Sequence, residues 1–166
     1  RLSGLDISID LDTVTSDNSG TEGISLDNIS DNLVVFGDEL RITTVNVDNA
    51  GTDGVRVTDS GADVRFGTLN VGVGGGAGAN GINIENLSGS FTVTTGGMVV
   101  DSTTNGVRIN GGNGAVNLTG ITIDNRGTNG MHLIGNTGTT TLNGVTVMTS
   151  GTSGIRVGDG DPMTAG

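Results

Sequence analysis

The sequence predicts an all-β fold, a parallel β-helix (solenoid) of about six coils with three short strands in each coil. Three observations predict it: no sustained helical periodicity, short runs in which apolar and polar residues alternate, and a repeated unit of roughly 24 residues. The chain of 166 residues contains 32 Gly, which interrupt nearly every window long enough for a helix. Runs such as Ile121–Ile123 alternate as half-buried strands do.

The repeat is clearest between Ile121 and Leu133, and the segments 45–57 and 145–157 match it closely. A coil of this size cannot bury its apolar side alone, so several coils must stack. The intervals between anchoring glycines shrink from 31 to 24 residues along the chain, which predicts a loop insertion at 27–41 within a single domain, 1–166. The anchoring glycines are Gly23, Gly54, Gly81, Gly106, Gly130 and Gly154.

Three strands are expected in each coil, and they form three faces of the solenoid. After Gly106 they are 107–109, 115–118 and 121–124. β-Branched side chains suit the inner, pleated surface of such a column. The side chains expected to point inward are Val55, Val57, Ile82, Ile84, Val107, Ile109, Met131, Leu133, Ile155 and Val157 on the first face, Val64, Phe66, Phe91, Val93, Val116, Leu118 and Leu142 on the second, and Val45, Val47, Ile121, Ile123, Val145 and Val147 on the third.

Composition and charge argue against several classes of partner. The net charge is −11 and all seven basic residues are Arg, so phosphate-dominated nucleic-acid binding is not expected. Anionic membrane surfaces are disfavoured for the same reason. No apolar run is long enough to cross a bilayer, and no signal peptide is evident, so no direct membrane insertion is expected. With no Cys there is no disulfide framework and no Cys-based metal site.

A strip of outward side chains on the first face is the candidate binding site. It consists of Arg56, Asn83, Arg108, His132 and Arg156, preceded by Ser25. One interpretation is a surface for an acidic glycan or another carboxylate partner. The favoured one is a solvated face with ion pairs of about 0–1 kcal/mol each. Glu85 is expected to lie diagonally between Arg56 and Arg108, because it follows Asn83 by two residues.

The third face offers a series of acids, Asp17, Asp48, Asp101 and Asp124, as a candidate metal site. In the expected register Asp17 neighbours Asp48, and Asp101 neighbours Asp124. Calcium is the plausible ion, since it accepts several oxygen ligands; no other cofactor is expected. The favoured alternative is that each Asp caps its own turn, because Asn follows Asp in three copies and suits the same role.

The outward row beside these acids is expected to be too mixed for the regular threonine lattice of an ice-binding surface. It would contain Thr15, Asn46, Gly72, Val99, Thr122 and Thr146.

No group of residues predicts catalysis, so the chain is not expected to be an enzyme. His132 is the single His and there is no Lys, which leaves few candidates for general acid–base chemistry. The insertion, with Asp31, Asp38 and Glu39, is the best place for an acidic cluster. The alternative therefore remains a fragment of a β-helix that binds or cleaves polysaccharides.

The repeated motif Ile-Thr-Ile-Asp-Asn-x-Gly-Thr-x-Gly-Val-Arg-Val resembles the right-handed β-helix of bacterial secreted surface proteins, which include autotransporter passengers and adhesins. The resemblance covers nearly the whole chain. It implies an extracellular or cell-surface location and a structural or adhesive role, and it supplies no catalytic residue. Neither end carries an evident capping helix, which predicts either a piece of a longer stalk or self-association by end-to-end stacking into a filament. A cell-surface glycan is the other expected partner.

Overall fold

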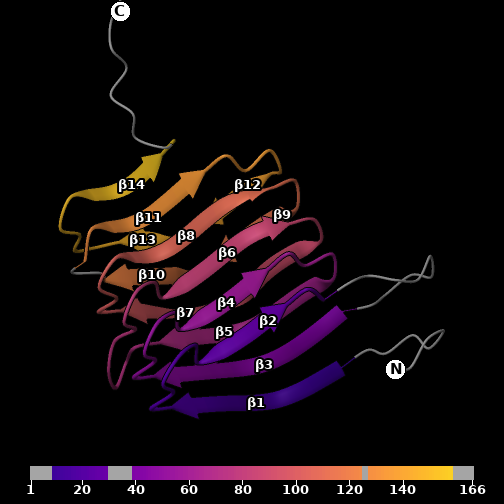
Figure 1. The fold of residues 1–166 in the computed structure, drawn as a ribbon, viewed down its shortest axis with the longest axis horizontal. Helices are drawn as coiled ribbons and strands as arrows, with labels where there is room; N and C mark the ends of the chain where they lie inside the picture. The colour runs from indigo at the N-terminus through magenta and orange to yellow at the C-terminus, as the bar shows by residue number, and fades with distance from the viewer. Residues whose placement is uncertain (1–8, 30–38, 125–126, 159–166) are drawn as a thin grey trace, which may run out of the picture.

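A computed structural model describes residues 9–29, 39–124 and 127–158 (Figure 1). Every regular element in this part of the chain is a strand. Alternation of β-branched residues with polar ones, and glycine between the runs, explain why short strands form. The strands are β1 (Ile9–Asp17), β2 (Ile24–Asp27), β3 (Glu39–Asp48), β4 (Val55–Thr58), β5 (Asp63–Val71), β6 (Ile82–Leu87), β7 (Ser90–Val100), β8 (Asn105–Gly112), β9 (Ala115–Thr119), β10 (Ile121–Asp124), β11 (Asn129–Ile134), β12 (Thr140–Asn143), β13 (Thr146–Val147) and β14 (Ser153–Val157).

The strands stack into two parallel sheets, which confirms the predicted parallel β-helix. Sheet B has the order β2-β4-β6-β8-β11-β14, and its six strands are separated by five steps, so the described chain makes about five turns. Sheet A follows β1-β3-β5-β7-β10-β13, with β9 and β12 beside this path. Figure 1 shows successive coils lying on one another from β1 and β2 to β13 and β14. Strand β3 begins at Glu39, inside the range 27–41, and residues 30–38 lie outside the described chain.

Three separate strands per coil occur only toward the C-terminal end. There, Gly120 and Gly144 adopt positive φ values of 64° each and divide β9 from β10 and β12 from β13. In the earlier coils β3, β5 and β7 run continuously across the second and third faces. Gly67 lies within β5 without a positive φ, so it does not interrupt that strand. A glycine in the left-handed region marks both of these breaks, whereas Gly96 and Gly97, with φ values of 115° and 142°, make an irregularity within β7 without dividing it.

The apolar core is one continuous column inside the coils, as predicted. Side chains such as Val55, Ile82 and Val107 on sheet B are fully buried. Phe66 and Phe91 meet edge to face, with ring centroids 5.4 Å apart, a favourable aromatic geometry. The column becomes exposed in the last coil, where Ile155 is 50 % and Val157 79 % exposed.

The anchoring glycines are required by close packing rather than by a left-handed backbone. A Cβ at Gly54 would overlap Cγ1 of Val71 and lie 2.6 Å from the carbonyl oxygen of Gly81. Gly81 and Gly130 occupy similar positions against Val99 and Val147. Each of these glycines therefore lets sheet B approach the third face closely.

Candidate functional site

The first-face strip is assembled in the predicted register. Pairing along sheet B places Ser25 beside Arg56, then Asn83, Arg108, His132 and Arg156 in succession. We call Arg56, Asn83, Arg108, His132 and Arg156 the arginine strip. The hydrogen-bonded pairing of β2, β4, β6, β8, β11 and β14 holds all of them on one outward row.

Acidic side chains neutralise the N-terminal part of the arginine strip, and an amide adds a hydrogen bond. Glu85 lies between two arginines, in an ion pair with Arg108 and 3.8 Å from Nη2 of Arg56. Nη1 of Arg56 lies 3.3 Å from Oε1 of Glu22, and Nη1 of Arg108 donates to Oδ1 of Asn83 at 3.0 Å. These contacts occupy the cationic groups that an acidic glycan would need.

The carboxyl of Glu22 has a pKa below its ordinary value. The largest cause is a hydrogen bond from the backbone N–H of Glu22, and Thr21 and Arg56 add to it while partial burial opposes it. At the other end of the strip, Nε2 of His132 lies 3.0 Å from the carbonyl oxygen of Gly158. Both groups thus take part in contacts within the solenoid.

The acids Asp17 and Asp48 are neighbours on adjacent coils, as predicted. Asp17 accepts a hydrogen bond of 3.0 Å from Nδ2 of Asn49, and Oδ1 of Asp48 accepts one of 2.7 Å from the backbone of Gly74. Asn49 has a φ of 51°, the left-handed conformation that Asn tolerates in turns. Each carboxylate thus accepts from the turn of the next coil and not, as predicted, from its own turn. A role of these acids with calcium remains a prediction.

Asp101 and Asp124 are not aligned, contrary to the predicted register. Asp124 pairs with Val100, which places Asp101 one residue further on, at a φ of 52° in the following turn. Within the described ranges, no three His, Cys, Asp or Glu side chains form a group that could hold a metal ion.

The outward row of the third face also differs from the expected one. Its members are Thr15, Asn46, Asn70, Met98, Thr122 and Thr146. Asn70 replaces the expected Gly72, and Met98 replaces Val99, which is fully buried. The expectation failed because the coil length changes both in the turn after Val71 and within β7, where the register shifts between Phe66 and Thr68.

A buried polar ladder inside the solenoid was missed by the sequence analysis. Nδ2 of Asn105 donates to Oδ1 of Asn80 at 2.8 Å, and Nδ2 of Asn129 donates to Oδ1 of Asn105 at 2.9 Å. Asn80 in turn donates to Oδ1 of Asp53 from its backbone at 3.1 Å and from Nδ2 at 2.8 Å. Oδ2 of Asp53 accepts from Nδ2 of Asn83 at 2.8 Å.

The hydrogen bonds of the ladder all run in one direction, and the last of them end at the carboxylate of Asp53. Each amide donates toward the N-terminal coil, and Asp53, which only accepts while ionised, receives the last donors. The sequence does contain a signal for this ladder: a polar residue precedes every anchoring glycine. These residues are Glu22, Asp53, Asn80, Asn105, Asn129 and Ser153.

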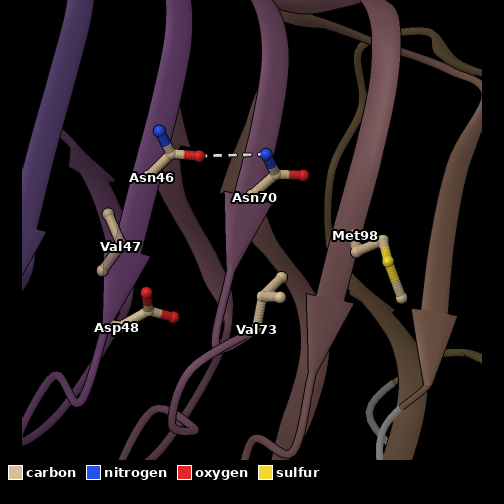
Figure 2. A pocket seen from close by; sticks show the side chains of 6 residues that line it. All are labelled: Asn46, Val47, Asp48, Asn70, Val73 and Met98. Atoms are coloured by element: carbon tan, nitrogen blue, oxygen red, sulfur yellow. Dashed lines mark hydrogen bonds between the residues drawn. The ribbon is translucent and has the colours of Figure 1, made fainter.

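Sheet A carries a surface hollow of about 250 Å³ on its outward side. It is lined by Asn46, Val47, Asp48, Asn70, Val73 and Met98, and we call it the Met98 hollow. Figure 2 shows Asn46, Asn70 and Met98 projecting from neighbouring strands, with Asp48 and Val73 below the two amides. Nδ2 of Asn70 donates to Oδ1 of Asn46 at 3.0 Å. The hollow therefore combines oriented amides, a carboxylate and three apolar side chains, of which Val73 and Met98 are exposed.

The proposed acidic cluster of the insertion falls mainly outside the described chain. Asp31 and Asp38 lie in the segment 30–38, which the structure does not describe. Glu39 belongs to β3 and contacts Arg41 at 2.6 Å and Arg65 at 3.8 Å. Among the described residues no helix is long and apolar enough to cross a membrane.

Comparisons with protein families, with curated proteins and with solved structures found no match for this chain.

Proposed function

We propose that the chain is an extracellular structural or adhesive β-helix segment that stacks end to end into a stalk or filament. The supporting observation is the exposure of inward-column residues in the two end coils, 9–29 and 140–158. Ile9 and Leu11 are 46 % and 40 % exposed in β1, and Ile155 and Val157 are 50 % and 79 % exposed in β14. In the coils between them the same column is closed, so a further coil, from the same chain or from a second copy, would bury this apolar surface. A bacterial cell surface is the proposed location.

Charge favours a head-to-tail arrangement of two copies. The described acids of the first end coil are Asp10, Asp12, Asp17, Glu22 and Asp27, and this coil has no described Arg. The last end coil, 140–158, has Arg156 and no acid. If β14 of one copy continues into β2 of the next in the sheet B register, Arg156 lies beside Ser25 and diagonally opposite Asp27. Arg56 has the same diagonal relation to Glu85. Such a heterologous contact does not close, and it therefore builds a fibre.

Sedimentation and electron microscopy across protein concentration test this proposal. We expect thin fibres whose length increases with concentration. Val157→Glu places a charge in the inward column and should give discrete particles. Asn113→Glu, an exposed change in the turn between β8 and β9 of a central coil, should leave the fibres intact. A strict monomer at high concentration, or fibres unaffected by Val157→Glu, would contradict the proposal. Fibres that dissolve on chelation would instead assign Asp17 and Asp48 to a calcium site.

Binding of polysaccharides is a second candidate function. The Met98 hollow supports it, since this hollow lies on the outward side of the solenoid and contains both polar and apolar groups. Binding to immobilised polysaccharides, with product analysis to detect cleavage, tests this alternative. An adhesive segment retains the polysaccharide unchanged, whereas an enzyme releases shortened chains.

A further inference from the structure

We propose that the Met98 hollow binds one sugar unit of a neutral, hydroxyl-rich glycan. This inference rests on the adhesive part of the proposed function and is independent of end-to-end stacking. It places the glycan-binding surface on the outward side of sheet A and not on the arginine strip of sheet B, which the sequence suggested as a surface for an acidic glycan.

The exposed apolar side chains are the first reason. Apart from the end coils, Val73 at 59 % and Met98 at 41 % are the exposed large hydrophobic residues of the described chain. Both line the same hollow. Met98 also interrupts an outward row whose neighbouring members are Asn70 and Thr122. A sugar ring presents a face of C–H groups that can cover such apolar atoms, so their position together indicates a ligand with an apolar face.

The polar atoms of the hollow are the second reason. Asn70 donates through Nδ2 to Asn46, which directs its Oδ1 toward Met98 (Figure 2). Asp48 uses Oδ1 to accept the N–H of Gly74. Within the described ranges, Oδ1 of Asn70 and Oδ2 of Asp48 have no protein donor. Two acceptors at the edge of an apolar surface match ligand hydroxyls, which donate hydrogen bonds.

The negative charge of the hollow and of the whole chain favours neutral glycans over acidic ones. The carboxylate of Asp48 repels a uronic acid or a sulfated sugar, and the net charge of −11 acts in the same direction at long range. A neutral sugar has no such penalty and still donates to both acceptors. On the arginine strip, by contrast, Glu22 and Glu85 already neutralise the groups that would attract an acidic chain.

The hollow is held in shape by tightly packed glycines. Gly72 has a φ of 78°, and a Cβ at Gly74 would lie 3.1 Å from Oδ2 of Asp48. Gly76 packs against the backbone of Asp101 so closely that a Cβ would overlap its carbonyl oxygen. The loop that carries Val73 is therefore fixed against both neighbouring coils. A preformed hollow lowers the ordering cost of binding, which matters for a weakly binding sugar.

The size and place of the hollow exclude larger occupants. Its volume of about 250 Å³ is below the roughly 300–1,000 Å³ typical of pockets for drug-sized ligands, so it suits one unit of a longer chain. Strands β3, β5 and β7 are each paired on both sides, so the hollow has no open strand edge to which an extended peptide could add. Thr122 and Thr146 continue the outward row and offer hydroxyls to adjoining sugar units.

Methionine-methyl NMR of the full chain tests the site directly. The four Met residues provide separate signals when their methyl groups are labelled with carbon-13. A neutral β-1,4-linked glucose hexamer should shift the Met98 signal and leave that of Met148, exposed in the last coil, unchanged. Polygalacturonate at equal sugar concentration should shift neither.

Two variants complete the test. Met98→Thr, which introduces the residue type found at 122, should lower the association constant about tenfold, as expected from the loss of an apolar contact. Met148→Thr is the matched control and should leave it unchanged. Far-UV circular dichroism confirms that both variants are folded.

Several outcomes would overturn the proposal. The first is that neither neutral glucan nor neutral galactan oligomers shift the Met98 signal. The second is that only polygalacturonate or a cationic glucosamine oligomer shifts it. The third is a shift of the Met98 signal on concentrating the protein without sugar, which would identify a second copy as the occupant. Glycan binding that survives Met98→Thr would leave the adhesive function standing and remove the hollow as its site. Fibre formation, measured separately by sedimentation, reports on stacking alone.

Discussion

Replacing Asn105 by Ala provides the sharpest test of the buried ladder. Asn105 is 3 % exposed and lies in the middle of the ladder, where it donates to Asn80 and accepts from Asn129. The alanine removes both hydrogen bonds at once and offers no replacement. Oδ1 of Asn80 then loses its donor from the next coil, and Nδ2 of Asn129 loses Asn105 as its acceptor.

The expected cost follows from those two buried groups. Each buried polar group deprived of its partner costs about 1–3 kcal/mol, so the loss of two should lower the free energy of unfolding of Asn105→Ala by about 2–6 kcal/mol. This is a large part of the roughly 5–15 kcal/mol that stabilises an ordinary domain. Because each coil contacts only its neighbours, the loss should centre on β6, β8 and β11.

Urea unfolding followed by circular dichroism measures the global loss, and amide hydrogen exchange locates it. Asn113→Ala is the matched control, since Asn113 is exposed and lies in the turn between β8 and β9. Its effect should stay within about 0.5 kcal/mol, as is usual for surface changes. If Asn105→Ala costs no more than Asn113→Ala, the ladder does not stabilise the solenoid and the reasoning is wrong.

Three further predictions concern the end of the ladder at Asp53, the close packing of Gly54 and the carboxyl of Glu22. Asp53→Asn should destabilise the fold by about 1–3 kcal/mol in urea unfolding, because the new amide N–H groups face donors. Gly54→Ala should cost about 1–3 kcal/mol or more through overpacking, whereas Gly20→Ala, where a Cβ meets nothing within 4 Å, should be neutral or slightly stabilising. The lowered pKa of Glu22 means that its contribution is present above the unfolded-state pKa and is lost as pH falls through the lower folded-state value. Glu22→Gln should therefore remove a small part of the acid destabilisation seen in thermal melts from pH 7 to pH 3. An unchanged pH profile would contradict the lowered pKa of Glu22.

Sheet B could be predicted from the sequence residue by residue. Each anchoring glycine lies immediately before a sheet B strand or is its second residue, so counting from Gly54 or Gly106 gives the register without any intervening turn. The pleat then fixes which side chains point inward, because a slip of one residue would turn the whole apolar set outward. This is why the arginine strip and the position of Glu85 were predicted correctly.

Sheet A was harder because turns of variable length separate it from the anchoring glycines. The Gly-rich turn after Val71 absorbs extra residues, and β7 contains an additional residue where Phe66 pairs with Val93 but Thr68 pairs with Gly96. Neither irregularity changes the local alternation of apolar and polar residues. The sequence therefore indicates that a third face exists but not that Met98 occupies its outward row.

The difference between the two sheets connects the two proposals. On sheet B, ion pairs neutralise Arg56 and Arg108 on the surface, and the buried ladder pairs the amides inside the solenoid. Sheet A, by contrast, keeps amides, hydroxyls and the Met98 hollow available on its surface. In a head-to-tail fibre the hollow would recur once per copy. With six sheet B strands per copy and an inter-strand distance of about 4.8 Å, neighbouring hollows would be roughly 29 Å apart along the fibre. A single hollow of this size binds weakly, but a glycan chain long enough to reach two of them gains about 10²–10⁴-fold in avidity. Stacking would thus convert a weak sugar site into an adhesive surface, and Val157→Glu should weaken binding to long glycans while leaving binding to the hexamer unchanged.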